Sequence, residues 1–181
     1  MKKRIIIAIA VVVVLAGIMT GVFFHDVKDS TRDVAKYEKY LGALGKFKEH
    51  SNRYNDIFPD EIPKSAKVEQ FFYDYYHLSD PNYLGYLVYT CDDEDYQKEY
   101  HRLSMIDSSQ NKYIYGATSF PYELCAVYAD QYYGYIYAMA DRANKRFMYV
   151  ELQFCNHFSD IDYDKIIDAK YLPTGFTAKK G

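Results

Sequence analysis

Apolar residues are densest at the start of the chain. Three basic residues occupy positions 2–4, and the run from Ile5 to Phe24 that follows contains no charged residue. A helix of about 20 residues is about 30 Å long, which matches the hydrocarbon thickness of a bilayer. The pattern therefore predicts a cytoplasmic tail at 1–4 and a transmembrane anchor at 5–24, with a cleavable signal peptide as the alternative for the apolar run.

The charges on the two sides of the apolar run indicate its orientation. Basic residues precede the run, and four more follow soon after it, at Lys28, Arg32, Lys36 and Lys39. A long domain is translocated largely regardless of its charge, whereas a short basic tail tends to stay inside. We therefore expect a single-pass protein of the cell membrane whose C-terminal domain is extracytoplasmic.

Helical spacing of apolar residues recurs beyond the anchor. Intervals of three and four predict a helix from Thr31 to Arg53, so that 25–56 forms a stalk or, preferably, a helix packed on the domain. A second helix is expected over Asp93–Ile106, whose acidic start suits the positive end of a helix dipole. A third, shorter helix is expected near Ile161–Ala169.

Alternating patterns typical of strands occupy most of residues 67–155. In the last of these segments Met148 and Val150 fall on one face, and Phe147 and Tyr149 fall on the other. Clusters of turn-forming residues separate the segments from one another. The predicted strands are Val68–His77, Tyr86–Cys91, Lys112–Ser119, Leu124–Ala129, Tyr133–Ala140 and Arg146–Cys155.

The order of these elements predicts the fold class. Helices that precede, interrupt and follow a set of strands are typical of an α+β domain. We expect such a domain at 57–172, with a mostly antiparallel sheet of about five or six strands and two or three packed helices. A C-terminal tail is expected at 173–181.

A proline-containing element stands between the first predicted helix and the strands. Pro59 and Pro63 favour extended backbone before each of them and remove two backbone donors, so the segment should be an ordered crossover with Phe58 and Ile62 docked on the domain. The sequence Phe58–Pro63 resembles an F-P-x-x-I-P element of small membrane-anchored bacterial proteins of unassigned activity. The resemblance implies a comparable anchored extracellular domain and no catalytic residue.

Tyrosine is the outlier in the composition, with 22 tyrosines, 11 phenylalanines and no tryptophan. Tyrosine suits strands because its ring packs while its hydroxyl reaches a polar partner, and it is also enriched at interfaces. Packing is the favoured explanation for most of these residues. If a contact surface for a partner or a sugar exists, its candidate residues are Tyr133, Tyr135, Tyr137 and Tyr149.

Charge and cysteine content narrow the class of protein further. Lys and Arg number 22 against 25 Asp and Glu, without a long cationic run, so nucleic acid is not expected as a partner. The three cysteines, Cys91, Cys125 and Cys155, all fall within or beside predicted strands. We expect buried free thiols there, with a Cys125–Cys155 disulfide as the alternative in an oxidising compartment.

No sequence motif identifies catalytic chemistry. G-x-S-x-G, S-x-x-K, P-loop and dinucleotide-binding patterns do not occur. Catalytic residues are therefore unknown, and an envelope hydrolase or transferase acting on cell-wall polymer would have to draw on Glu151, His157, His101 and Cys155.

A metal or cofactor is not expected either. Residues 160–164 read D-x-D-x-D like the opening of a calcium loop, but Lys165 stands where that loop needs glycine and Tyr171 where it needs glutamate. The sequence thus favours a membrane-anchored extracytoplasmic binding domain of unknown ligand, with an envelope protein as the expected partner, and leans away from an enzyme.

Overall fold

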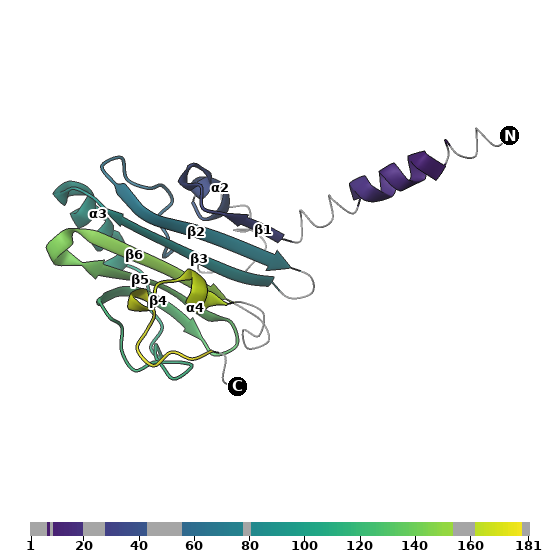
Figure 1. The fold of residues 1–181 in the computed structure, drawn as a ribbon. Helices are drawn as coiled ribbons and strands as arrows, with labels where there is room; N and C mark the ends of the chain where they lie inside the picture. Colours follow the sequence, from purple (N-terminus) through teal and green to yellow (C-terminus); the bar gives the residue numbers. More distant parts are fainter. Residues whose placement is uncertain are drawn as a thin grey trace.

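A six-stranded antiparallel sheet forms the centre of the protein, in the order β1-β2-β3-β6-β5-β4 (Figure 1). The computed structural model describes residues 7, 9–19, 28–42, 56–77, 81–153 and 162–178. The strands are β1 (Lys28–Thr31), β2 (Lys67–His77), β3 (Pro81–Thr90), β4 (Glu123–Asp130), β5 (Gly134–Asp141) and β6 (Arg146–Gln153). The helices are α2 (Tyr37–Tyr40), α3 (Asp93–Ser104) and α4 (Tyr163–Ile166), with 3₁₀ turns η1 (Val34–Lys36), η2 (Arg142–Asn144) and η3 (Ala169–Tyr171). The predicted α+β class is confirmed.

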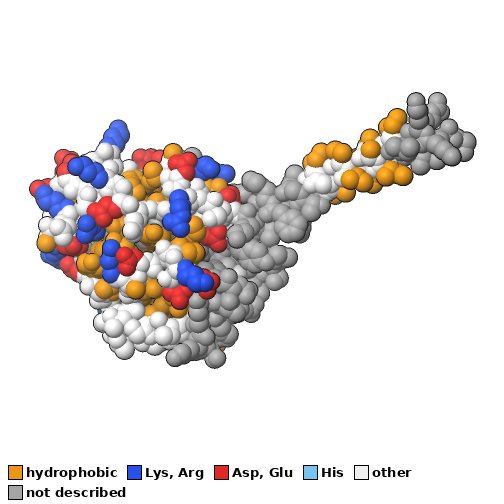
Figure 2. Space-filling model, in the orientation of Figure 1, with side chains coloured by type: hydrophobic (Ala, Val, Ile, Leu, Met, Phe, Trp, Pro, Cys, Tyr) orange, Lys and Arg blue, Asp and Glu red, His pale blue; other side chains and the backbone are white. Residues whose placement is uncertain are grey.

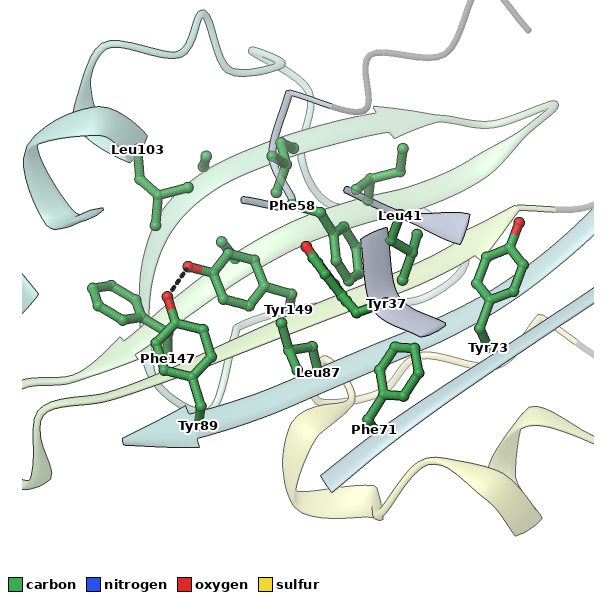
Figure 3. Close-up of a cluster of buried hydrophobic side chains, with 14 of the residues drawn as sticks. Tyr37, Leu41, Phe58, Phe71, Tyr73, Leu87, Tyr89, Leu103, Phe147 and Tyr149 are labelled. Atoms are coloured by element: carbon green, nitrogen blue, oxygen red, sulfur yellow. Dashed lines mark hydrogen bonds between the residues drawn. The ribbon is translucent and has the colours of Figure 1, made fainter. Parts of the chain in front are cut away.

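Both faces of the sheet are covered, because both faces are apolar. On one face, side chains of β6 such as Phe147 and Tyr149 pack under α2, α3 and the crossover at 56–66 (Figure 3). On the other face, Met148 and Val150 pack under residues 112–122 and 162–178. The alternation predicted for β6 is therefore confirmed. Its two faces belong to two buried aromatic clusters, and neither face is exposed to solvent.

Five of the six predicted strands are present in the described part of the chain. The exception is Lys112–Ser119, which is irregular apart from a single bridge between Ser119 and Thr174. Its backbone is bonded elsewhere, since the Ile114 N–H donates to the Tyr135 hydroxyl at 2.8 Å. Tyr115 and Gly116 then turn the chain with φ values of 51° and 79°. The sequence pattern missed β1, whose residues, Lys-Asp-Ser-Thr, show no apolar alternation.

The first predicted helix is much shorter than expected within the described residues. Thr31 ends β1, and helical structure runs only through η1 and α2, where Asp33 caps η1 by accepting the Ala35 N–H at 3.1 Å. Residues 43–53 lie outside the described residues. Tyr37 and Leu41 are buried on the sheet, so the described part of this segment is packed on the domain. The prediction of α3 is confirmed, with Asp92 as its cap.

Residues 9–19 form an N-terminal helix. Among the residues that the structure describes, no helix is long and apolar enough to cross a membrane. The expected span at 5–24 continues beyond the described residues on both sides of this helix. All described side chains of the helix are exposed, and Figure 2 shows hydrophobic side chains along the side of it in view.

The crossover was predicted correctly. Phe58 is buried in the aromatic cluster beneath α3, and Ile62 packs at its margin. The Tyr37 hydroxyl donates to the Pro59 carbonyl at 2.6 Å, which ties α2 to the crossover. Gly42 approaches the Asp60 carbonyl so closely that a Cβ would have no room there.

The C-terminal segment is part of the domain, although the sequence suggested a tail from residue 173. Phe176 and Ala178 are buried against the sheet. Thr174 exchanges two backbone hydrogen bonds of 2.9 Å with residues 118 and 119. Gly116 and Gly175 meet where the two segments cross, and both have a φ near +80°.

Gly175→Ala is expected to lower the free energy of unfolding by about 1–3 kcal/mol. The φ of +80° is strained for alanine, and its Cβ would lie 2.6 Å from the Gly116 carbonyl oxygen. Urea unfolding followed by circular dichroism measures the loss. Gly85→Ala is the control, since its Cβ would meet its nearest neighbour, the Tyr73 ring, at an ordinary 3.4 Å. An equal loss in both variants would contradict this explanation.

Candidate functional site

A buried chain of hydrogen bonds joins the sheet to α3. The hydroxyls of Tyr89 and Tyr149 lie 3.1 Å apart, and their bond is drawn in Figure 3. Tyr149 donates to Glu99 Oε1 at 2.5 Å. Arg102 holds the same carboxylate with two hydrogen bonds of 2.6 and 2.7 Å. Glu99 therefore has a charged partner and a hydroxyl partner inside the domain.

Arg102 extends this network to the crossover. Its guanidinium also donates to the carbonyl of Asp56 and, at 2.8 Å, to that of Ile57. A single side chain thus bridges α3, the buried carboxylate and the segment that carries Phe58. Such shared use of planar donors is characteristic of arginine and would not be reproduced by lysine.

The electrostatics of the network favour a fixed protonation state. Burial raises the pKa of Tyr149 and Tyr89 well above the usual value, and the negative charge of Glu99 adds to the effect. Burial by itself would lower the pKa of Arg102, but its hydrogen bonds to Glu99 outweigh this and leave the pKa above its ordinary value. The tyrosines therefore stay neutral at neutral pH beside the Glu99–Arg102 salt bridge of 2.6 Å, which suits a structural role.

Alkaline pH is expected to destabilise the fold. Burial raises the pKa of Tyr37 and Tyr137 well above 10, and that of Tyr96 to about 12. Above about pH 10 the unfolded chain loses tyrosine protons that the folded chain keeps, so stability falls as pH rises. This stability is fully present below pH 10 and is lost progressively above it.

Urea midpoints measured from neutral pH to about pH 11 check this expectation. The midpoint should hold until the unfolded tyrosines begin to titrate and then decrease. Tyr133→Phe, at an exposed position, should leave the profile unchanged. A midpoint that stays constant up to the highest pH would contradict it.

The structure does not bring the four candidate contact tyrosines together. Tyr149 is fully buried on the face under α3, and Tyr135 and Tyr137 are fully buried on the opposite face. Their hydroxyls are used internally, since Tyr135 donates to the Lys112 carbonyl at 2.8 Å and Tyr137 to the Tyr171 carbonyl at 2.7 Å. Only Tyr133 of the four is exposed, because it lies in the turn between β4 and β5.

Cys91 and Cys125 are free thiols. Burial raises the pKa of Cys91 to about 11 and that of Cys125 to about 12. Both are therefore protonated at neutral pH, which makes them poor nucleophiles. Cys155, the partner of Cys125 in the alternative of a disulfide, lies outside the described residues.

The described catalytic candidates do not form a shared open site. Glu151 is fully buried within the sheet, whereas His101 is exposed on α3. His157 and Cys155 lie outside the described residues. Within the described part of the chain, no group of three or more His, Cys, Asp or Glu side chains could hold a metal ion.

An open groove lies beside the outer strand of the sheet. It has a volume of about 670 Å³ and is lined by Asp56, Ile57, residues 105–110, Val127 and Tyr128. Asp56 and Asp107 bring carboxylates to it, and Met105 presents a largely exposed, flexible side chain. Two of the segments that build this groove follow Asp56 by about 50 and 70 residues, so no local motif could have revealed it.

One wall of the groove also closes the edge of the sheet. Ser109 N–H donates to the Val127 carbonyl at 2.8 Å, and the Ser108 and Ser109 hydroxyls accept the N–H groups of Val127 and Ala129. These bonds occupy backbone groups that an added strand would need. The groove therefore offers side chains for recognition rather than a free strand edge.

Comparison with protein-family models, with curated proteins and with solved structures gives no significant match.

Proposed function

We propose that this chain is a single-pass, membrane-anchored binding protein whose domain lies outside the cytoplasm and contacts a protein of the envelope. The anchor rests on one observation above all. The uncharged run from Ile5 to Phe24 includes a helix at 9–19 whose described side chains are all exposed. An isolated helix of this length is marginal in water. Transfer of its exposed aliphatic side chains from water into apolar surroundings would lower their free energy.

Binding is favoured over catalysis by the chemistry of the described side chains. The Glu99 carboxylate is already hydrogen-bonded to Arg102 inside the domain. The two described thiols are protonated at neutral pH and are therefore poor nucleophiles. The groove at Met105, by contrast, is open, and its largely exposed methionine is of a residue type that is enriched in protein contact surfaces. It is our candidate for the partner contact.

The anchor is tested by flotation of membranes from cells that express the full chain. Val12→Asp combined with Val14→Asp should release the protein from the membrane fraction, because each aspartate costs about 3 kcal/mol at the centre of a span. Val34→Asp, at an exposed position of the domain, is the control and should leave flotation unchanged. A wild-type chain that fails to float with membranes would overturn the anchor.

The orientation and the partner contact need separate measurements. Protease added to intact spheroplasts should degrade the domain if it is extracytoplasmic, whereas a protected domain would reverse the orientation. A photo-crosslinking residue in place of Met105 should give a discrete protein adduct in intact membranes, and the same residue in place of Lys98, exposed on α3, should not. The same adducts at both positions would argue against the groove.

A further inference from the structure

The exposed tyrosines gather at one place. Among the described residues, the large tyrosine side chains that remain exposed are Tyr113, Tyr132 and Tyr133, at 48%, 73% and 54%. Tyr132 and Tyr133 form the turn between β4 and β5, where both backbone N–H groups donate to Asp130. These three residues are here called the tyrosine patch.

Hydrogen bonds hold the two parts of the patch beside the start of β5. The Tyr135 hydroxyl donates to the Lys112 carbonyl at 2.8 Å and accepts the Ile114 N–H, so Tyr113 is fixed between these two contacts. The Tyr115 hydroxyl donates to the Gln131 carbonyl in the turn itself. The patch therefore belongs to one end of the sheet.

Strand register shows that the chain enters the sheet at this same end, after the N-terminal helix. Gly134 at the start of β5 is paired with Gln153, which lies opposite Tyr83 of β3, and Tyr83 lies opposite Tyr75 of β2. Tyr75 is paired with Asp29 of β1, next to the point where the chain enters the sheet at Lys28. Figure 1 shows β1, β2 and β3 with this end towards the N-terminal helix.

The tether between the apolar run and the sheet is short. Only three residues separate Phe24 from Lys28, so their Cα atoms can be at most about 14 Å apart. The polar headgroup layer on each side of the hydrocarbon is about 5–7 Å thick. If the run spans a bilayer, the end of the sheet that begins at Lys28 is held close to the headgroups. The turn before β5 is four strand spacings away, about 19 Å along the same end.

We propose that the tyrosine patch rests in the headgroup layer of the membrane that holds the chain's own anchor. This inference rests on the proposed anchoring. Tyrosine is enriched at membrane–water interfaces because its ring enters the apolar boundary while its hydroxyl keeps polar contacts. Lys112, whose ammonium lies 5.8 Å from the centre of the Tyr113 ring, adds a cation that can meet lipid phosphate.

The absence of tryptophan from the natural chain allows a direct test. The full-length variants Tyr133→Trp, Ala143→Trp and Val13→Trp each carry a single indole and are reconstituted in phosphatidylcholine vesicles. Ala143 is exposed in η2 at the opposite end of the sheet and serves as the matched control. Lipids with a spin label on the headgroup, or with brominated acyl chains, quench fluorescence at the two depths. Tyr132→Trp repeats the measurement if Tyr133→Trp does not fold.

We expect Tyr133→Trp to lose about half of its emission with headgroup-labelled lipid, as an interfacial aromatic residue should, and Ala143→Trp to lose little. Val13→Trp should be quenched by brominated acyl chains. If Val13→Trp is quenched but Tyr133→Trp is no more affected than Ala143→Trp, the anchor stands and the docking of the patch is overturned. If Val13→Trp is not quenched by brominated chains, the anchoring fails and the docking fails with it.

Discussion

Tyr149→Ala is expected to lower the free energy of unfolding by about 4 kcal/mol. The side chain is fully buried in contact with Phe58, Tyr89 and Phe147, so its removal leaves a cavity. It also removes the hydroxyl that donates to Glu99, and this leaves a buried carboxylate with one partner fewer. Urea unfolding of the purified chain, followed by circular dichroism, measures the change.

Tyr133→Ala is the matched control for this experiment. Tyr133 is exposed in the turn before β5, and its truncation should change the free energy of unfolding by no more than about 0.5 kcal/mol. Tyr149→Phe should give an intermediate loss, because it keeps the ring and removes only the hydroxyl. Similar losses for Tyr149→Ala and Tyr133→Ala would mean that burial does not separate these tyrosines as described.

Arg102→Ala is expected to destabilise the fold by about 3 kcal/mol, because it leaves the Glu99 carboxylate buried without its cation. The expected value is at the lower end of the range for buried pairs, since the Arg102 side chain is 35% exposed whereas that of Glu99 is 8% exposed. Loss of the contacts to the Asp56 and Ile57 carbonyls should also loosen the crossover.

A double-mutant cycle separates the ion pair from these other contacts. Glu99→Ala together with Arg102→Ala should cost less than the sum of the two single changes, since neither charge is then left buried alone. Arg142→Ala removes an equally close bidentate contact, to Glu123, but from the surface, and its effect should be much smaller. Additive losses in the cycle would show that the pair is not coupled.

The buried network and the tyrosine patch use the same residue type for opposite purposes. Tyr89 and Tyr149 bring rings and hydroxyls into the interior, where each hydroxyl has a partner. Tyr132 and Tyr133 present theirs to the outside, and their turn is fixed by Asp130. Among the described residues, tyrosine therefore serves mainly packing, and the exposed tyrosines gather at the end of the sheet where the chain enters it.

The strands with strong patterns were predictable, and the weak ones were not. Alternation within 146–153 identified β6 and assigned its residues to two faces, because strand geometry alone fixes that assignment. Lys112–Ser119 was also predicted as a strand, yet it forms a loop because Tyr135 and the C-terminal segment bind its backbone. β1 lacks a pattern and exists because it pairs with β2.

The candidate site could not be inferred from local sequence. Glu99 and Arg102 are neighbours on α3, but their partners Tyr149 and Ile57 lie about 50 residues away in either direction. The groove at Met105 likewise combines distant segments. Acidic and basic side chains on a helix are usually solvated, and these two are covered only because the crossover packs beside them.

The sequence by itself determined the apolar N-terminal run, the α+β class, the main strands and the crossover at Phe58, because these depend on local periodicity and backbone restriction. Only the tertiary structure decided which tyrosines are buried. Both faces of a strand can be covered, and burial then depends on segments that return from elsewhere in the chain. For that reason Tyr135, Tyr137 and Tyr149 became core residues, whereas Tyr133, one residue before β5, stayed on the surface.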